Sequence, residues 1–181
     1  AGLYADIIAK QFGFAQKCKI LPFKGLYLYA KTPMVKTHIY PVPDLDYPFL
    51  GVHFTLNVEG QTKIGPTAIP AFWREQYRGF DNFSVQEALD IGFRSAGLFL
   101  RSNFDFKRLA LTELRKYSKK HLIKQAQALV PDCLFKDFDS WGRAGIRAQL
   151  IDTDSGKLFM DFLFEGDRKS FHVLNAVSPG W

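Results

Sequence analysis

Apolar and polar residues alternate with a period of two in the first third of the chain, which predicts strands there rather than helices. The stretches with this pattern are residues 19–31, 38–42, 50–56 and 62–64. Gly25 interrupts the first, and Pro41 and Pro43 halt the second, because proline cannot donate to a sheet ladder. Residues 57–60 join the last two stretches as a hairpin turn, in which Gly60 can take a positive φ.

The strand at 50–56 has two chemically different faces, because successive side chains point to opposite sides. Val52 and Phe54 share one face, whereas Gly51, His53 and Thr55 share the other. The second face has no bulky apolar group between its polar side chains. It is therefore a candidate floor for a ligand.

An apolar period of 3.6 residues predicts helices at the start and in the middle of the chain. At the start, Leu3, Ile7 and Ile8 form an apolar stripe within residues 1–10, and Gly13 suits a C-cap. This stripe is the expected buried face of the first helix.

The helical middle of the chain begins with a clear signal at Ser84, an N-cap residue followed three positions later by Glu87, which completes a capping box. Further helices are expected at 106–117 and 120–130, and strands return at 135–151, 157–164 and 170–174. The elements together predict an α+β fold with a mixed, largely antiparallel sheet of roughly six to eight strands. The helices of residues 84–130 form the predicted layer on one face of that sheet.

Composition narrows the class of protein. The 181 residues are 47% hydrophobic, with a formal charge of +6 that is concentrated in residues 107–124. A solvated helix face explains that charge better than a nucleic-acid or membrane patch, because no RNA- or DNA-binding motif accompanies it. No apolar run approaches the ~20 residues that span a bilayer, and two isolated cysteines suit a reducing compartment. We therefore expect a cytoplasmic protein without a transmembrane segment or a nucleic-acid partner.

Metal and nucleophile chemistry find no support in the sequence. The four histidines show no i, i+4 pairing and no nearby cysteine or aspartate set. Neither a Gly-x-Ser-x-Gly elbow nor a Walker loop is present.

Six short motifs, taken in order, point to one family. They are Leu-Pro-Phe-Lys-Gly at 21–25, Tyr-Pro-Val-Pro-Asp at 40–44, Pro-Phe-Leu-Gly-Val-His at 48–53, Gly-Pro at 65–66, Ala-Gly-Ile-Arg-Ala-Gln at 144–149 and Asn-Ala-Val-Ser-Pro at 175–179. The chain resembles the L-2-hydroxyglutarate dehydrogenase/oxidase family of FAD enzymes, within the D-amino-acid-oxidase-like superfamily. The resemblance covers almost the whole chain.

This resemblance implies a division of the chain between two domains of a longer enzyme. Residues 1–18 correspond to part of an FAD-binding domain, 19–174 to the substrate-binding domain, and 175–181 to the return into the FAD-binding domain. The sequence has no Gly-x-Gly-x-x-Gly fingerprint, which in such enzymes holds the FAD pyrophosphate at a helix N-terminus. We therefore expect an inactive fragment that does not hold FAD tightly on its own.

The resemblance also assigns the catalytic residues. The related amino-acid oxidases grip a substrate carboxylate with an arginine at the place of Arg147, and a guanidinium can do so bidentately. His53 suits the base that takes the hydroxyl proton, since its unperturbed pKa of about 6.5 lies near neutrality. Tyr40 is expected to line the same pocket. The alternatives are an exposed strand arginine and a histidine that is hydrogen-bonded at a sheet surface.

Weaker assignments complete the expected site. His38, Lys24 and Lys63 are candidate substrate-binding residues, the two lysines for a second carboxylate, although each lysine also suits an ordinary surface position. Candidate cofactor contacts, by close backbone approach or by position in the last loop, are Gly2, Gly25, Gly65, Gly145, Asn175 and Ser178. Plain turn or bulge roles are the alternative for these glycines.

The expected function is FAD-dependent oxidation of a 2-hydroxy acid, L-2-hydroxyglutarate by resemblance, to the 2-oxo acid. A related amino-acid or amine oxidase and a non-enzymatic anion-binding module are the alternatives. The sequence leaves open whether the electron acceptor is oxygen or a quinone, and whether the protein associates peripherally with a membrane.

Overall fold

The computed structural model describes residues 2–42, 51–101, 115 and 118–176. Its helices are α1 (Ala5–Gln11), α2 (Val85–Arg101) and α4 (Lys119–Ala126), with a 3-10 turn at Phe135–Asp137. Its strands are β1 (Cys18–Gly25), β2 (Leu28–Ala30), β3 (His53–Leu56), β4 (Thr62–Gly65), β5 (Ile69–Pro70), β6 (Phe138–Trp141), β7 (Gly145–Asp152), β8 (Leu163–Gly166) and β9 (Phe171–Asn175). The α+β class is confirmed. The helix expected at 106–117 falls outside the described residues, apart from Arg115.

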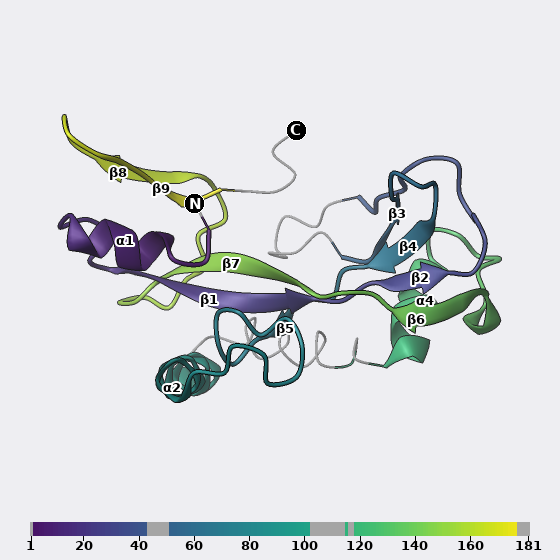
Figure 1. The fold of residues 1–181 in the computed structure, drawn as a ribbon, viewed down its shortest axis with the longest axis horizontal. Coiled ribbons are helices and arrows are strands. Elements are labelled where there is room, and N and C mark those ends of the chain that lie inside the picture. Colours follow the sequence, from purple (N-terminus) through teal and green to yellow (C-terminus); the bar gives the residue numbers. More distant parts are fainter. Residues whose placement is uncertain (1, 43–50, 102–114, 116–117, 177–181) are drawn as a thin grey trace.

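The strands form three antiparallel sheets instead of the single mixed sheet that the sequence predicted. Their orders are β5-β1-β7, β3-β4-β2-β6 and β8-β9 (Figure 1). The ladder breaks between β1 and β2 because the backbone of Leu26 bonds elsewhere: its N–H donates to Thr67 Oγ1 at 3.0 Å, and its carbonyl accepts from Thr67 N at 3.1 Å. Thr67 thereby takes the hydrogen bonds that a neighbouring strand would need.

Several predicted elements are shorter than expected. Strand β3 begins at His53, and the 38–42 segment contributes one isolated bridge, Ile39 with Phe54. Of the strand expected at 157–164, only Leu158 bridges to Ile151 before β8 begins at Leu163. In between, the carbonyl of Phe159 accepts side-chain hydrogen bonds from Gln149 and Asn175.

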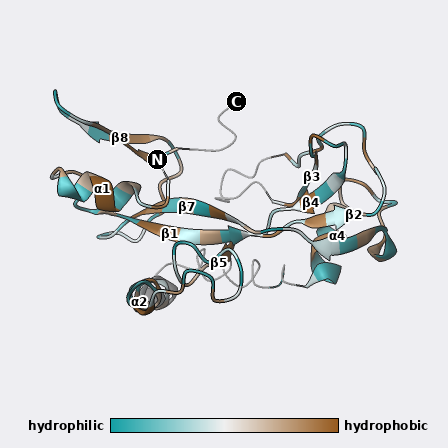
Figure 2. Cartoon of the chain, in the orientation of Figure 1, coloured by the Kyte–Doolittle hydropathy of each residue, from teal (hydrophilic) through white to brown (hydrophobic). Residues whose placement is uncertain are grey.

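The buried residues gather in three clusters, one for each contact between a helix and a sheet. Helix α4 covers Leu28, Phe54 and Ile64 of the four-stranded sheet. Ile91 of α2 packs with Leu21 and Phe23 of β1. Ala9 of α1 packs against the other face of the β1–β7 pair. Figure 2 shows that both α1 and α2 also carry polar residues, as expected for helices that cover a sheet on one side.

The buried face of α1 was predicted wrongly. Ile7 and Ile8 are 41% and 51% exposed, whereas Asp6 and Ala9 are buried. The apolar stripe is displaced because Asp6 has a buried cationic partner. Arg74 donates to the two carboxylate oxygens of Asp6 at 2.9 Å each, and the N–H of Ile20 donates to the same carboxylate at 3.1 Å.

The same arginine changes the start of α2. Ser84 Oγ accepts from the N–H of Glu87 at 3.3 Å, which confirms the cap. The Glu87 carboxylate does not return to the Ser84 backbone, as a capping box requires. It accepts from the N–H of Arg74 at 2.9 Å, so only half of the predicted box forms.

We predict that Asp6→Asn lowers the free energy of unfolding by about 3–5 kcal/mol, because it leaves the buried Arg74 guanidinium with only the Glu87 carboxylate, at 3.9 Å, as a counter-charge. Urea denaturation, followed by circular dichroism, measures the effect. Asp154→Asn is the matched control, because it breaks an ion pair with Lys17 in which both side chains are largely exposed. Equal stability losses in the two variants would contradict this role of Asp6.

Candidate active site

The four-stranded sheet has one apolar face and one polar, aromatic face. Phe54, Ile64 and Leu28 are aligned across β3, β4 and β2, and all three are buried toward α4. Their chain neighbours therefore point to the opposite side. We call this side the His53 face; it comprises Tyr27, Tyr29, His38, Tyr40, His53, Thr55, Gly65 and Lys63.

The bridge between Ile39 and Phe54 adds His38 and Tyr40 to this face. Two backbone hydrogen bonds of 2.9 and 3.0 Å form the bridge, so Tyr40 lies across from His53 and His38 across from Thr55. The Tyr40 and His53 ring centroids are 4.7 Å apart. Those of His38 and Tyr40 are 6.3 Å apart. The structure thus brings together three residues that the sequence proposed separately.

His53 is held in one tautomer. Its Nδ1 lies 3.0 Å from the carbonyl oxygen of Gly51. A carbonyl can only accept, so Nδ1 carries the proton and Nε2 keeps its lone pair. Burial lowers the pKa of His53 below 6.5, and the nearby Lys63 and His38 lower it further, against the hydrogen bond to Gly51, which raises it. The ring is therefore neutral near pH 7, with Nε2 able to accept a proton.

Lys63 and Thr55 lie side by side on the same face, paired across β3 and β4. Lys63 Nζ is 4.6 Å from the centroid of the Tyr27 ring, a cation–π contact. Thr55 Oγ1 is fully buried and makes no hydrogen bond within the described part of the chain. This face therefore presents the Lys63 ammonium group near the His53 imidazole, with the buried Thr55 hydroxyl beneath its surface.

Tyr27 was missing from the sequence-based site. Its ring packs over Gly65, where an added Cβ would come within 2.8 Å of the Tyr27 ring. Gly65 has φ +143°, so both its conformation and its neighbour exclude a side chain. The signal for Tyr27 was the alternation Leu26-Tyr27-Leu28-Tyr29, which puts both tyrosines on the face opposite Leu28.

Arg147 and Lys24 lie on β7 and β1, in the three-stranded sheet. Arg147 pairs with Phe23, and Lys24 pairs with Ile146. Because neighbouring residues of a strand point to opposite sides, Arg147 and Lys24 project from opposite faces of this sheet. One small ligand can therefore contact only one of the two cations.

The two cations also differ in their surroundings. Lys24 is only 9% exposed, and burial alone lowers its pKa. The structure shows no hydrogen bond or ion pair for its ammonium group within the residues it describes. Arg147 is more exposed, although the protein packed around its guanidinium still lowers its pKa. It remains a cation at any physiological pH.

The proposed cofactor contacts fall into two groups. Gly25 and Asn175 have internal roles: a Cβ on Gly25 would lie 3.1 Å from Pro66 Cβ, and Asn175 Nδ2 donates to the carbonyls of Phe159 and Asp161. Gly2 and Gly145 have no atom of the described residues, other than those of their own chain neighbours, within 4 Å of an added Cβ. Ser178 lies outside the described residues.

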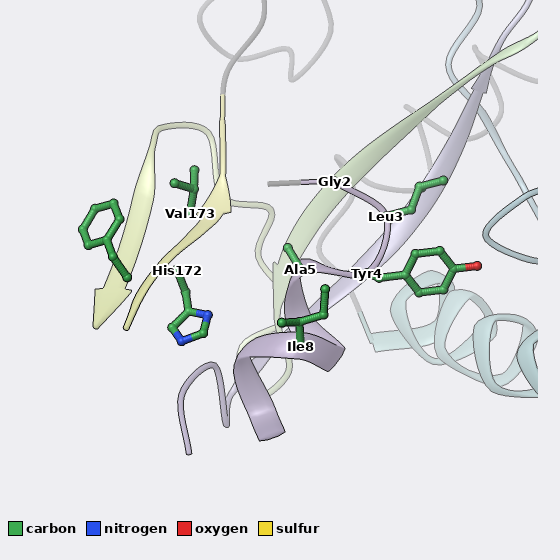
Figure 3. Close-up of a pocket in the computed structure, with 8 residues that line it drawn as sticks. Gly2, Leu3, Tyr4, Ala5, Ile8, His172 and Val173 are labelled. Carbon is green, nitrogen blue, oxygen red and sulfur yellow. The ribbon is translucent and has the colours of Figure 1, made fainter. Parts of the chain in front are cut away.

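Gly2 also lines a cavity of about 400 Å³ between the start of α1 and β9. Figure 3 shows Ile8 and His172 on its two sides, with Tyr4 pointing away from β9. The His172 ring is fixed there between Phe12 and Phe14, at centroid distances of 5.3 and 5.1 Å.

Two features of the described residues bear on function. None of the helices in this part of the chain is long and apolar enough to cross a membrane. The same part holds no group of three or more histidine, cysteine, aspartate or glutamate residues that could bind a metal ion.

Comparison with known proteins identifies the class. The family model described as FAD dependent oxidoreductase (DAO) matches residues 1–181, and the chain belongs to this family.

Among curated proteins, the chain is similar to L-2-hydroxyglutarate dehydrogenases. It is 42% identical to the mitochondrial enzyme of Homo sapiens over 189 aligned positions, which cover 99% of this chain and 40% of that protein. It is 40% identical to the enzyme of Indibacter alkaliphilus (99% and 45% covered) and 38% identical to that of Salmonella houtenae (99% and 42%). The chain thus spans less than half the length of these relatives.

We predict that His53 titrates below pH 6.5 in the folded protein. The folded state then binds fewer protons than the unfolded state, so stability falls as the pH drops below the unfolded value of about 6.5. NMR titration of the histidine ring protons measures the pKa, and His53→Gln should remove this part of the pH dependence of unfolding. A His53 pKa above 6.5 would contradict the prediction.

Proposed function

We propose that this chain supplies the substrate-binding surface of an FAD-dependent dehydrogenase that oxidises a 2-hydroxy acid to the 2-oxo acid. The relatives' names favour L-2-hydroxyglutarate as the substrate. The observation that carries the proposal is the state of His53: neutral, fixed by Gly51, and adjacent to Tyr40 on a face that also presents Lys63.

In the proposed reaction, His53 Nε2 takes the proton of the substrate hydroxyl while the hydrogen on the same carbon leaves as hydride. FAD, when bound, would accept this hydride. The hydroxyl oxygen becomes the carbonyl of the 2-oxo acid, so the substrate loses two electrons and two hydrogens. Tyr40 hydrogen-bonds the substrate beside His53. His38 lies next to Tyr40, and its Nδ1 accepts from the N–H of Leu56 at 3.1 Å.

Charge at the site is suited to a dicarboxylate. Lys63 lies on the His53 face and binds one carboxylate. For the other, Arg147 is favoured by the family resemblance and by its planar fork of donors. Lys24 is favoured because its side chain is only 9% exposed and its ammonium group has no partner among the described residues, so an anionic ligand would offset the burial that lowers its pKa. Because Arg147 and Lys24 project from opposite faces of the sheet, only one of them can bind this carboxylate.

The residues present suit FAD at two places. Gly2, beside its cavity, and Gly145, on β7, would both let a flat ring or a phosphate approach the backbone. We assign residues 1–18 and 175–181 to the cofactor-binding part and 19–174 to the substrate-binding part. Packing of α1 against β1 and β9 joins the two parts. The proposal leaves oxygen, a quinone and a membrane-bound acceptor open as electron partners.

We predict that His53→Gln, in the full-length enzyme, lowers kcat by about 10²–10⁴-fold, because a positioned base contributes that much. Oxidation of L-2-hydroxyglutarate, followed by flavin reduction in single turnovers, measures the effect. His121→Gln on α4 is the control and should leave the rate unchanged. A normal rate of flavin reduction in the His53→Gln enzyme would contradict the role of His53 as the catalytic base.

We predict that losing the true carboxylate clamp costs on the order of 2–4 kcal/mol of substrate binding, about 30- to 1000-fold in KM. Arg147→Lys and Lys24→Met, compared in the full-length enzyme, identify which cation is responsible. Only one variant should show this increase, because the two side chains occupy opposite faces. An unchanged KM in both variants would show that neither Arg147 nor Lys24 binds the substrate carboxylate.

A further inference from the structure

A cationic hollow is lined by residues other than those of the His53 face. Tyr77, Arg78, Asp81 and Arg143 line a cavity of about 300 Å³. Three of these residues come from the loop between β5 and α2. Arg143 comes from the connection between β6 and β7, more than sixty residues later. Folding therefore brings these residues together, and no sequence motif predicts the hollow.

Neither arginine has a carboxylate partner among the residues that the structure describes. The ion pairs that the structure shows among the described residues involve other cations, and neither Arg78 nor Arg143 takes part in one. The Arg143 guanidinium carbon lies 5.7 Å from the centroid of the Tyr77 ring. This contact orients the planar guanidinium without neutralising its charge.

The loop that carries Arg78 is rigidly built. The Trp73 indole N–H donates to the carbonyl of Asp81 at 2.7 Å, and the N–H of Asp81 donates to the carbonyl of Arg78 at 2.8 Å. The Trp73 ring also packs edge-on against Phe83, at 4.9 Å between centroids. The backbone of Arg78 and Asp81 is therefore fixed before any ligand arrives, which reduces the ordering cost of binding.

The side chains define the ligand. Two guanidinium groups favour an oxyanion that offers each planar fork a pair of oxygens, either a carboxylate or a phosphate. Asp81 would repel a bare anion, but its carboxylate accepts a hydrogen bond from a neighbouring hydroxyl. The volume suits a molecule of only a few carbon atoms.

We propose that Arg78, Arg143, Tyr77 and Asp81 form a binding site for a small hydroxylated oxyanion, built from none of the residues of the proposed substrate site. The two arginines bind its carboxylate or phosphate, Tyr77 holds Arg143 in position, and Asp81 accepts from its hydroxyl.

Isothermal titration calorimetry of the purified protein tests the site, with sn-glycerol 3-phosphate and L-malate as the two probes. We expect at least one to bind with a roughly millimolar or lower Kd. Arg78→Gln and Arg143→Gln should each weaken binding at least tenfold, and the exposed Arg168→Gln should not. The preferred probe decides between phosphate and carboxylate.

Succinate tests the role of Asp81, because it is malate without the hydroxyl. Asp81→Asn should strengthen succinate binding, since it removes a repulsion, and should narrow the preference for malate over succinate. L-malate is itself a 2-hydroxy acid that the His53 face could bind, so only the binding that is lost in Arg78→Gln or Arg143→Gln counts for this site. His53→Gln should leave that arginine-dependent binding unchanged, so failure of the proposed oxidation and failure of this site are distinguishable. No saturable binding of either probe up to about 10 mM, or binding that is insensitive to both arginine variants, overturns the proposal.

Discussion

The buried pair between Arg74 and Asp6 is the interaction on which most of this structure depends. Both side chains are almost fully buried, at 3% and 1% exposed, and a charge removed from water to this extent is tolerated only with a counter-charge in good geometry. Asp6 fixes α1 and receives the N–H of Ile20 in β1, while the backbone of Arg74 bonds Glu87 at the start of α2. One arginine thus ties together two helices, a strand and the loop that carries Arg78. The cavity beside Gly2 and the hollow beside Arg143 both lie next to elements that it positions.

The sequence predicts local structure well where one face of an element is apolar. The strands around residues 20, 54, 64 and 148 follow from alternation, and the Ser84 cap follows from its spacing to Glu87. What alternation does not encode is the point at which a ladder stops. Thr67 is distant in sequence from Leu26, yet its hydroxyl and N–H end the pairing of β1 and split the expected sheet. The buried face of α1 was predicted wrongly for a similar reason. Apolar periodicity puts a charged residue such as Asp6 on the exposed face, and its burial is explained only by Arg74, 68 residues away.

In the candidate site, too, the sequence predicts local features but not long-range contacts. His53 and Lys63 were predictable because strand alternation puts them on the polar side of known strands, and Tyr40 because a motif suggested it. Their assembly depends on one backbone bridge, Ile39 with Phe54. Alternation at 38–42 predicts a strand there, but it shows neither that pairing stops after one bridge nor which residue is the partner. The tautomer of His53 depends on the carbonyl of Gly51, which the sequence shows only as a neighbouring glycine. Residue types were therefore foreseeable, whereas their relative geometry was not.

The register of β1 and β7 adds a constraint that reaches beyond this chain. Gly25 and Gly145 face each other at the end of the ladder, and the Cβ-free side of Gly145 opens to solvent while that of Gly25 is filled by Pro66. A planar group that approaches this end can thus lie only over Gly145. Gly145 is two residues from Arg147 and shares its face, whereas Lys24 is on the other side. If the flat ring of a cofactor uses the Gly145 opening, the cation nearest to it is Arg147, and the buried Lys24 serves a different surface. Identifying which of the two cations binds the carboxylate would therefore also identify the face of the sheet on which the cofactor lies.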